Sequence, residues 1–303
     1  MQQNKEGTTQ NLEIDAAASK HEHARSNNYQ IQPPSKSMPD LDQRRGYEIA
    51  AAIRKLREAK GETVVGRKIG FTNRNIWPEY NIDASNWSYM YNSTIIDLSK
   101  RGGMVQDTSA EVDISHLSRL EPRIEPEIVL GLKHVPSAGM KDGEILDCID
   151  WIAHGFEVVA SIFPDWKFTA ADTTAAFALH GLLLLGPRVH VQELAARPNE
   201  TLDQLANFEI SLYQNNELAD QGAGSNVLGS PIQALRHLLE LLEGDALNTP
   251  LSRGEVITTG TLTRALPIHD GDVWSTKLQG IDLPGLRIEF NVDGNGRPCG
   301  AEQ

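Results

Sequence analysis

The chain has 303 residues, of which 40% are apolar and 23% charged, an ordinary composition for a globular protein that buries a sizeable core. Its 28 Lys and Arg residues stand against 41 Asp and Glu residues, so the formal net charge is −13. Because no long basic run is present, we expect neither nucleic acid nor an anionic membrane surface as a partner. A small anion is still an acceptable ligand if a cation lies in its pocket.

The cysteines and the hydropathy of the sequence indicate the cellular compartment in which the protein works. Cys148 and Cys299 lie far apart and form no CxxC or Cys/His zinc spacing, which suits free thiols in a reducing environment. Residues 1–10 are polar and lack the apolar core of a secretory signal peptide. No stretch approaches the about 20 apolar residues that a membrane-spanning helix needs. We therefore expect a cytoplasmic protein without a membrane partner.

The N-terminal part of the chain is predicted to be helical. The alanine-rich segment 12–24 favours a first helix, and two consecutive prolines then mark an extended connection. Apolar residues near helical spacing predict a second helix that is capped by Asp40 or Asp42 and ends at Gly61.

Beyond Gly61 the pattern indicates strands. The expected strands are 63–71, 124–130, 181–185, 208–213, 255–259, 272–278 and 286–290. Pro126 lies inside the second of them, and because proline has no N–H we expect that strand at a sheet edge or near a strand end. The apolar run 148–163 is compatible with either a helix or a strand.

The clearest helix signal begins at Ser230, a good N-cap, followed by Pro231 at the first helical position and by Gly244 as a stop. Strands before and after a few helices, without regular alternation, indicate an α+β (mixed α/β) protein rather than a doubly wound sheet. The expected organisation is a flexible start at 1–10 and a single catalytic domain at 11–303, made of a helical part at 11–62 and a β-rich core at 63–303.

The most informative segment is Arg123-Ile124-Glu125-Pro126-Glu127. In a strand alternate side chains share a face, so Glu125 and Glu127 would lie side by side. Two carboxylates that close repel each other, and a divalent cation removes that cost. Oxygen-only ligands suit Mg²⁺ or Mn²⁺. The competing interpretation is that both glutamates alternate on a solvent-facing strand.

Glu157 adds a third carboxylate. It lies in the apolar segment GFEVV, where an unpaired charge would be costly. We therefore group it with Glu125 and Glu127 as a candidate metal ligand. The alternative is a salt bridge to a nearby basic group.

Lys68, in GRKIGFT, alternates with apolar neighbours and is flanked by two glycines. A partly buried lysine beside a metal would have a lowered pKa, which suits proton transfer. Its other interpretation is a surface lysine on a strand. Thr259-Gly260-Thr261 ends a strand in a turn whose hydroxyls and N–H groups can bind a substrate carboxylate, although an ordinary hairpin turn explains it equally well.

Two histidines are weaker candidates. His154 precedes Glu157 by three residues, so the two side chains face one cavity on a helix and opposite ways on a strand. His180 precedes an expected strand. Either residue can equally be a hydrogen-bonded core histidine.

Several of these segments together resemble the 2-keto-4-pentenoate hydratase and 4-oxalocrotonate decarboxylase group of the fumarylacetoacetate hydrolase superfamily. The matching pieces, in family order, are GRKIGFTN (66–73), PRIEPEIVLGL (122–132), HGFEVV (154–159), PDWKF (164–168), ADT (171–173), GSNVLGSPIQAL (224–235) and GEVITTGTLTRALPIHDGD (254–272). The resemblance covers nearly everything after about residue 40 and is specific as a combination.

The resemblance implies a rolled mixed β-sheet core with peripheral helices, and a homo-oligomer. It also implies Mg²⁺ or Mn²⁺ held by Glu125, Glu127 and Glu157. The family lysine corresponds to Lys68. A TGS-like turn that binds substrate corresponds to Thr259, Gly260 and Thr261, and we add Arg123, beside the carboxylates, as a candidate for binding substrate.

Two segments depart from the family pattern. Many relatives carry an acidic PDFG-like stretch after the lysine strand, whereas this chain reads Ala84-Ser85-Asn86-Trp87-Ser88. Many also carry ADN where this chain has Ala175-Ala176-Phe177. Both lie near the expected pocket, so they bear on the substrate and the reaction.

These residues support a hypothesis of metal-assisted hydration of a 2-hydroxydienoic or 2-oxo-alkenoic acid. The metal would stabilise negative charge on the 2-oxygen of an enolate, and Lys68 would move a proton during ketonisation. Water would then add to give a 4-hydroxy-2-oxo acid, with His154 and His180 as candidate bases. Three alternatives stay open: decarboxylation of a 2-oxo acid through the same enolate, C–C hydrolysis of an acylpyruvate, and a non-catalytic carboxylate-binding homologue.

Overall fold

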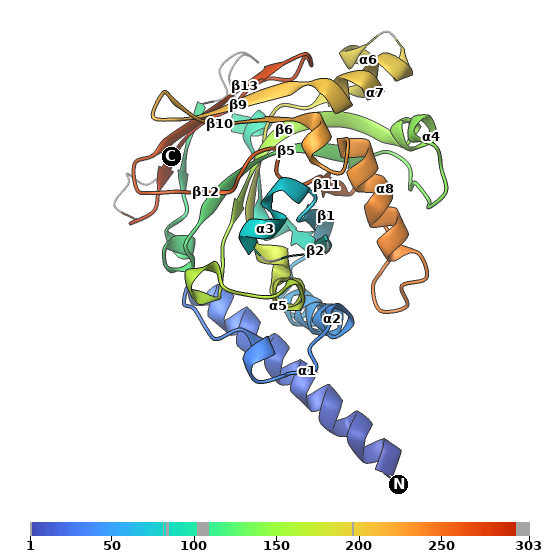
Figure 1. Cartoon of the computed structure of the whole chain (residues 1–303), viewed down its shortest axis with the longest axis vertical. Coiled ribbons are helices and arrows are strands. Elements are labelled where there is room, and N and C mark those ends of the chain that lie inside the picture. Colours follow the sequence, from blue (N-terminus) through green and yellow to red (C-terminus); the bar gives the residue numbers. More distant parts are fainter. Residues whose placement is uncertain (1, 81, 83–84, 102–108, 196, 295–303) are drawn as a thin grey trace.

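The computed structural model (Figure 1) describes residues 2–80, 82, 85–101, 109–195 and 197–294, and it contains two β-sheets with helices around them. The nine-stranded sheet runs in the order β2 (Asn86–Tyr91), β1 (Val64–Gly70), β11 (Val256–Thr258), β5 (Arg123–Leu132), β6 (Ile149–Val159), β7 (His180–Leu185) and β3 (Ile95–Asp97). The short strands β12 (Leu266–Pro267) and β8 (Val189–His190) pair with β5 and β6. The five-stranded sheet runs in the order β10 (Glu217–Ala223), β9 (Glu209–Gln214), β13 (Val273–Gln279), β14 (Arg287–Asn291) and β4 (Ser109–Asp113).

The helices lie around the large sheet. They are α1 (Gln2–Ser26), α2 (Gln43–Ala59), α3 (Trp77–Tyr80), α4 (Asp142–Asp147), α5 (Ala170–Ala175), α6 (Val191–Leu194), α7 (Pro198–Asn207) and α8 (Pro231–Leu242). In Figure 1, α1 lies along α2 and extends beyond the body of the molecule, whereas α8 lies beside β1 and β11. This mixture of sheets and helices confirms the predicted α+β class.

The predicted helices are present, with altered bounds. Asp42 caps α2 by accepting a hydrogen bond from the Arg45 amide, and Ser230 caps α8 by accepting one from the Gln233 amide. The first helix was expected over 12–24 but reaches back to Gln2, into the segment for which we expected flexibility. Flexibility of 1–10 stays a prediction.

The segment 148–163 shows how tertiary context decides an ambiguous pattern. Its apolar residues are buried in β6 between β5 and β7, so a continuous apolar run reflects a strand that is covered on both faces rather than a helix. Each of the other predicted strands is also present within a few residues of its expected bounds.

The prediction for Pro126 was wrong. β5 is a central strand, and Pro126 lies in its middle, opposite Phe156. The Pro126 carbonyl accepts from the Leu262 amide at 2.9 Å, so this residue faces the gap between β11 and β12, where residues 259–265 cross. Because the neighbouring strand is interrupted there, the missing N–H removes no ladder hydrogen bond.

No helix among the described residues is long and apolar enough to cross a membrane.

A buried ion pair fixes β1 against β11. Arg67 is fully buried, donates to Glu255 at 2.8 Å, and lies over the Tyr89 ring at 4.2 Å from its centroid. Since side chains alternate along a strand, Arg67 points to the face opposite Lys68. The pair therefore helps to hold the strand that carries Lys68.

We predict that Arg67→Met lowers the free energy of unfolding by about 3–5 kcal/mol, because it leaves the Glu255 carboxylate buried without its partner. Removing both charges, in Arg67→Met with Glu255→Met, is expected to recover most of that loss. Urea denaturation measures the change, with Arg44→Met as control, because the Arg44 side chain is 83% exposed. A loss in Arg67→Met no larger than in the control would contradict the prediction.

Candidate active site

Three glutamates converge in the middle of the large sheet. Glu125 and Glu127 share one face of β5, and Glu125 pairs directly with Glu157 on β6. Each offers a carboxylate oxygen within 4.8 Å of the others, and all three side chains are buried. The structure therefore brings together the three predicted metal ligands.

Lys68 approaches this cluster from β1. Its Nζ lies 3.2 Å from Glu157 Oε2 and 3.9 Å from Glu125 Oε2, and the residue is 3% exposed. Thr258 on β11 pairs with both Lys68 and Val129, which places Lys68 on the same sheet face as the glutamates. Burial alone would lower the pKa of Lys68, but the three carboxylates outweigh burial and raise it. We expected a lowered pKa for Lys68 beside a metal, whereas the carboxylates without a metal raise the pKa of Lys68.

The three carboxyl groups do not ionise alike. Burial first, and then the charge of Glu157, raises the pKa of Glu125 to about 7, although Lys68 acts to lower it. Burial and Glu157 raise the pKa of Glu127 well above its usual range. For Glu157, burial is outweighed by Lys68 and His180, which lower its pKa to about 2. The single positive charge of Lys68 therefore cannot compensate three ionised carboxylates.

Unsatisfied oxygens show that this cluster fits a cation. Among the described residues, the buried Glu127 Oε1 has no hydrogen-bond partner, and the buried Glu157 Oε2 faces the Lys68 ammonium at 3.2 Å. Glu127 Oε2 accepts from the Gly260 amide at 2.7 Å, which orients the carboxylate. Buried oxygens without a donor are costly, and a hard divalent cation such as Mg²⁺ or Mn²⁺ is the ligand that such oxygens bind.

The two candidate histidines have different places. His180 Nδ1 lies 2.7 Å from Glu157 Oε1, and its Nε2 lies 2.9 Å from Thr94 Oγ1. Burial, as the largest effect, lowers the pKa of His180, so the neutral ring orients Glu157. His154 was a wrong candidate, because it lies in the strand β6 (Ile149–Val159) three residues before Glu157, and its side chain therefore points to the opposite face. There His154 Nδ1 lies 3.0 Å from the Glu127 carbonyl oxygen, and Nε2 lies 2.9 Å from Thr276 Oγ1 in the other sheet.

The turn 259–261 lies beside the carboxylates, but its hydroxyls are engaged elsewhere. Thr259 Oγ1 donates to the Ile128 carbonyl at 3.0 Å, and Thr261 Oγ1 donates to the Thr263 carbonyl at 3.0 Å. The backbone of Gly260 is the part of this turn that contacts a carboxylate. Arg123, two residues before Glu125 on the same strand face, stacks over the Trp166 ring at 4.1 Å from its centroid.

A small, partly enclosed cavity of about 20 Å³ lies beside the cluster. Its polar wall contains Lys68, Glu125, Gly260 and Thr261; its other lining residues are Ile69, Gly70, Phe71, Ile76, Val159, Trp166, Ala178 and Leu179. A space of about 10–15 Å³ is enough for one water. The cavity is thus a water-sized space with an ionic floor and a mainly apolar cover.

Strained backbone is concentrated in that cover. Phe71, Trp166 and Leu179 have φ of 56°, 54° and 63°, in the left-handed region that non-glycine residues rarely adopt. Ala178, with φ 46°, belongs to the same wall. Such strain costs on the order of 1–3 kcal/mol for each residue and is often found at functional sites.

The two segments that depart from the family pattern both lie at this site. Asn86, at the start of β2, pairs with Gly70 and is 1% exposed. Phe177 directly precedes the lining residues Ala178 and Leu179. We had not predicted a role for Asn86, and only its place opposite the lysine strand could have suggested one. Ala84 lies outside the described residues.

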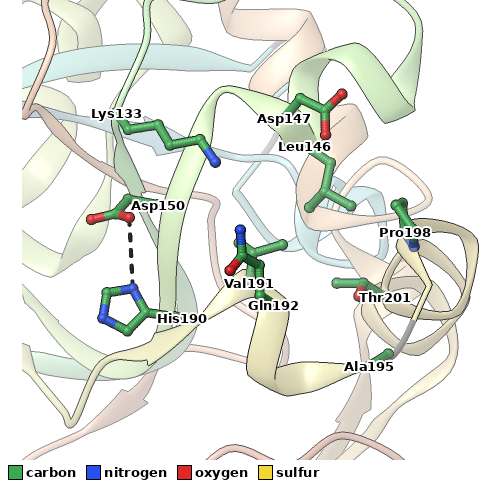
Figure 2. Close-up of a pocket in the computed structure, with 10 residues that line it drawn as sticks. All are labelled: Lys133, Leu146, Asp147, Asp150, His190, Val191, Gln192, Ala195, Pro198 and Thr201. Atoms are coloured by element: carbon green, nitrogen blue, oxygen red, sulfur yellow. Dashed lines mark ion pairs between the residues drawn. The ribbon is translucent and has the colours of Figure 1, made fainter.

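A larger cavity of about 310 Å³ lies elsewhere, among α4, β6, β8, α6 and α7 (Figure 2). Asp150 and His190, 3.6 Å apart, form the ion pair drawn there, and both side chains are at least half exposed. None of the predicted site residues lines this cavity. We place the chemistry at the carboxylate cluster, because that is where buried charge is concentrated.

Comparisons with known proteins agree with this geometry. A family model described as "Fumarylacetoacetate (FAA) hydrolase C-terminal" matches residues 102–286. The chain is 29% identical over 259 residues to a 2-hydroxyhexa-2,4-dienoate hydratase of Comamonas testosteroni, covering 85% of this chain and 90% of that protein. It is 27% identical over 270 residues to a 4-oxalocrotonate decarboxylase of Pseudomonas sp. (strain CF600), covering 88% and 93%.

A solved structure extends the likeness to the fold. The 4-oxalocrotonate decarboxylase from Pseudomonas putida G7, complexed with magnesium and adipate, superposes with a TM-score of 0.79 at 24% identity, covering 92% of this chain and 97% of that one. The predicted rolled mixed sheet with peripheral helices is confirmed. Because the family model matches more than half of its length, this chain belongs to the fumarylacetoacetate hydrolase family.

Proposed function

We propose that this protein is a metal-dependent hydratase that adds water to a small 2-hydroxydienoate or 2-oxo-alkenoate. The observation that carries the proposal is the cluster of three buried carboxylates and one lysine beneath a water-sized, mainly apolar cavity. The names of the sequence relatives, hydratases and decarboxylases of related acids, support the same reaction class.

Glu125, Glu127 and Glu157 would hold Mg²⁺ or Mn²⁺, since all three are buried within reach of one ion and Glu127 Oε1 has no hydrogen-bond partner among the described residues. The ion supplies Lewis-acid stabilisation of negative charge on the substrate's 2-oxygen. His180 and the Gly260 amide keep two of the carboxylates in place through hydrogen bonds of 2.7 Å each.

Lys68 would carry the proton during ketonisation. With 2-hydroxypenta-2,4-dienoate, the 2-hydroxyl loses its proton, and the ammonium delivers one to C5. The product of this step is 2-oxopent-3-enoate, whose C3=C4 bond is conjugated with the ketone and therefore electrophilic at C4. Water then adds at C4 while C3 gains a proton, which gives 4-hydroxy-2-oxopentanoate. In the metal-free site the three carboxylates raise the pKa of Lys68 and favour its ammonium form, the form that can donate this proton.

The cover of the cavity favours hydration over decarboxylation of a dicarboxylic acid. Phe71, Ile76 and Leu179 form an apolar part of the cavity lining, where the distal end of a bound substrate would lie. A second carboxylate buried there would lack a solvating partner, which is costly. A substrate with one carboxylate and a short hydrocarbon tail fits this wall better.

Arg123 is the candidate for binding the single carboxylate of the substrate. It lies two residues from Glu125 on the same face of β5, and its positive charge acts to lower the pKa of that glutamate. Gly260 and Thr261 line the cavity and are candidate substrate contacts through their backbone. A homo-oligomeric state and a cytoplasmic location stay predictions.

The first test is product mass spectrometry with 2-hydroxypenta-2,4-dienoate, 2-oxohex-3-enedioate and an acylpyruvate, each with Mg²⁺ and with chelator. We expect a metal-dependent gain of water with the first substrate only. Loss of carbon dioxide from the second would select the decarboxylase, and cleavage of the third would select the C–C hydrolase. A protein that binds Mg²⁺ and oxalate but turns over none of the three would be a non-catalytic homologue.

A second prediction concerns Glu127→Gln. It keeps the shape and an acceptor for the Gly260 amide but removes a charged ligand, so we expect Mg²⁺ affinity and turnover to fall at least about 100-fold while the fold is retained. Isothermal titration with Mg²⁺, steady-state kinetics and circular dichroism measure these effects. The exposed Glu289 on β14, changed to Gln, is the control. Equal affinity and turnover in both variants would remove the metal site.

A third prediction concerns pH. Glu125 (pKa about 7) and Glu127 (raised pKa) hold protons that a metal must displace, whereas Glu157 (pKa about 2) is already ionised. Mg²⁺ affinity should therefore fall as the pH is lowered from about 8 to about 6, by about tenfold per unit for each proton displaced. Titrations in two buffers of different ionisation enthalpy count those protons. Affinity independent of pH, with no proton release, would contradict this charge assignment.

A further inference from the structure

Asn86 places an amide beside the catalytic lysine without being used by the mechanism described so far. It begins β2, pairs with Gly70 at the end of β1, and is 1% exposed. Because Ser88 pairs with Lys68 on the same two strands, Asn86 shares the sheet face of Lys68.

The hydrogen bonds around Asn86 fix which end of its amide is the nitrogen. The hydroxyls of Thr173 and Thr174 donate to the Ala170 carbonyl at 2.8 and 3.0 Å. A hydroxyl has one proton, so both groups are left as acceptors for the Asn86 amide nitrogen, at 3.0 and 3.3 Å. The carbonyl oxygen Oδ1 must therefore point away from them.

That oxygen points toward the cavity wall and is unsatisfied. Among the described residues, no hydrogen-bond donor reaches the buried Asn86 Oδ1. A Cβ added to Gly70 would lie 2.5 Å from Oδ1, 3.3 Å from Lys68 Cε and 3.7 Å from Ala178 Cβ. Gly70, Lys68 and Ala178 line the cavity, whereas Asn86 does not, so the space left by the missing side chain of Gly70 lies between Oδ1 and the cavity.

A buried acceptor without a donor destabilises the folded protein, so we look for a donor that arrives with the reaction. The Lys68 ammonium is the nearest cation on this wall, but it lies against Glu157 and Glu125. The other donor that the proposed reaction brings into this space is water, for which a cavity of about 20 Å³ is large enough.

We propose that the side-chain carbonyl of Asn86 binds and orients the water that adds to the substrate, an inference that rests on the proposed hydratase function. The water oxygen bonds to C4 of the 2-oxo-3-enoate as one of its O–H bonds breaks, C3 takes the electron pair of the C3=C4 bond, and in the net reaction the proton released from the water ends on C3. The second hydrogen stays on the oxygen and is donated to Asn86 Oδ1 throughout. Asn86 therefore directs a lone pair of the water at C4 and gains no proton itself.

Two reactions distinguish the orientation of water by Asn86 from the metal-dependent enolisation that the rest of the site performs. Hydration of 2-hydroxypenta-2,4-dienoate needs the oriented water. The Mg²⁺-dependent exchange of the C3 hydrogens of 2-oxopentanoate in D₂O, followed by NMR, needs enolisation but no water addition. For Asn86→Leu we expect kcat of hydration to fall about 100-fold and exchange to stay within about threefold of wild type.

Gly70→Ala tests the same point without changing Asn86. Its methyl group would lie against Oδ1 and separate it from the cavity, so hydration should fall and exchange should persist. Asn86→Asp keeps an acceptor in place and should retain more hydration than Asn86→Leu. Ser88→Ala is the control, because the Ser88 hydroxyl donates to the Tyr89 carbonyl and does not line the cavity.

The outcomes are distinct. Unchanged hydration in Asn86→Leu, or in Gly70→Ala if the leucine variant does not fold, would overturn the proposal. Equal loss of hydration and exchange would also overturn it, because Asn86 would then act through Lys68 or the fold. Absence of Mg²⁺-dependent exchange in the wild-type protein would count against the proposed function itself.

Discussion

The arrangement of this site depends on the repulsion between three carboxylates that the sheet holds within 4.8 Å of one another. One ammonium faces them, so two negative charges would remain uncompensated if all three ionised. The protein alone lowers this cost by keeping protons on Glu125 and Glu127, whose pKa values burial raises. A divalent cation would remove the cost directly, and the same charge would then act on the substrate.

Strand register makes this repulsion unavoidable. Glu125 lies directly opposite Glu157, and a shift of one residue would turn one of them to the opposite face of the sheet. The gap between β11 and β12 serves the same site, since it admits both Pro126 and the turn whose Gly260 amide donates to Glu127. A proline would weaken an ordinary central strand, but here it lies beside a gap that also makes room for the Gly260 amide, the donor to Glu127.

Sequence patterns predicted the parts of the site that depend on local periodicity. A strand at Glu125 and Glu127 implied their shared face, and the apolar surroundings of Glu157 and Lys68 singled those two residues out. The family resemblance then supplied the rolled sheet and the grouping of these residues in one site. The direction of the His154 side chain could not be predicted from the pattern, because the apolar run 148–163 is compatible with a buried helix and with a buried strand. Only the pairing of β6 with β5 and with β7 decided that the segment is a strand, and as a strand it turns His154 toward Thr276.

Asn86 was missed for a similar reason. Its unsatisfied oxygen is defined by hydrogen bonds to Thr173 and Thr174, which lie 87 and 88 residues away in the chain. No local spacing connects such residues. Composition likewise gave no sign of the positive φ angles in the cover, because Phe71, Trp166 and Leu179 are ordinary apolar residues in the sequence.

The cover combines two opposing requirements of hydration. A dry cavity strengthens the electrostatic interactions of Lys68 and the carboxylates, yet the reaction consumes a water. A space of about 20 Å³ meets both needs only if it admits one ordered water, and it is too small for a five-carbon acid. Substrate must therefore displace part of the cover on entry.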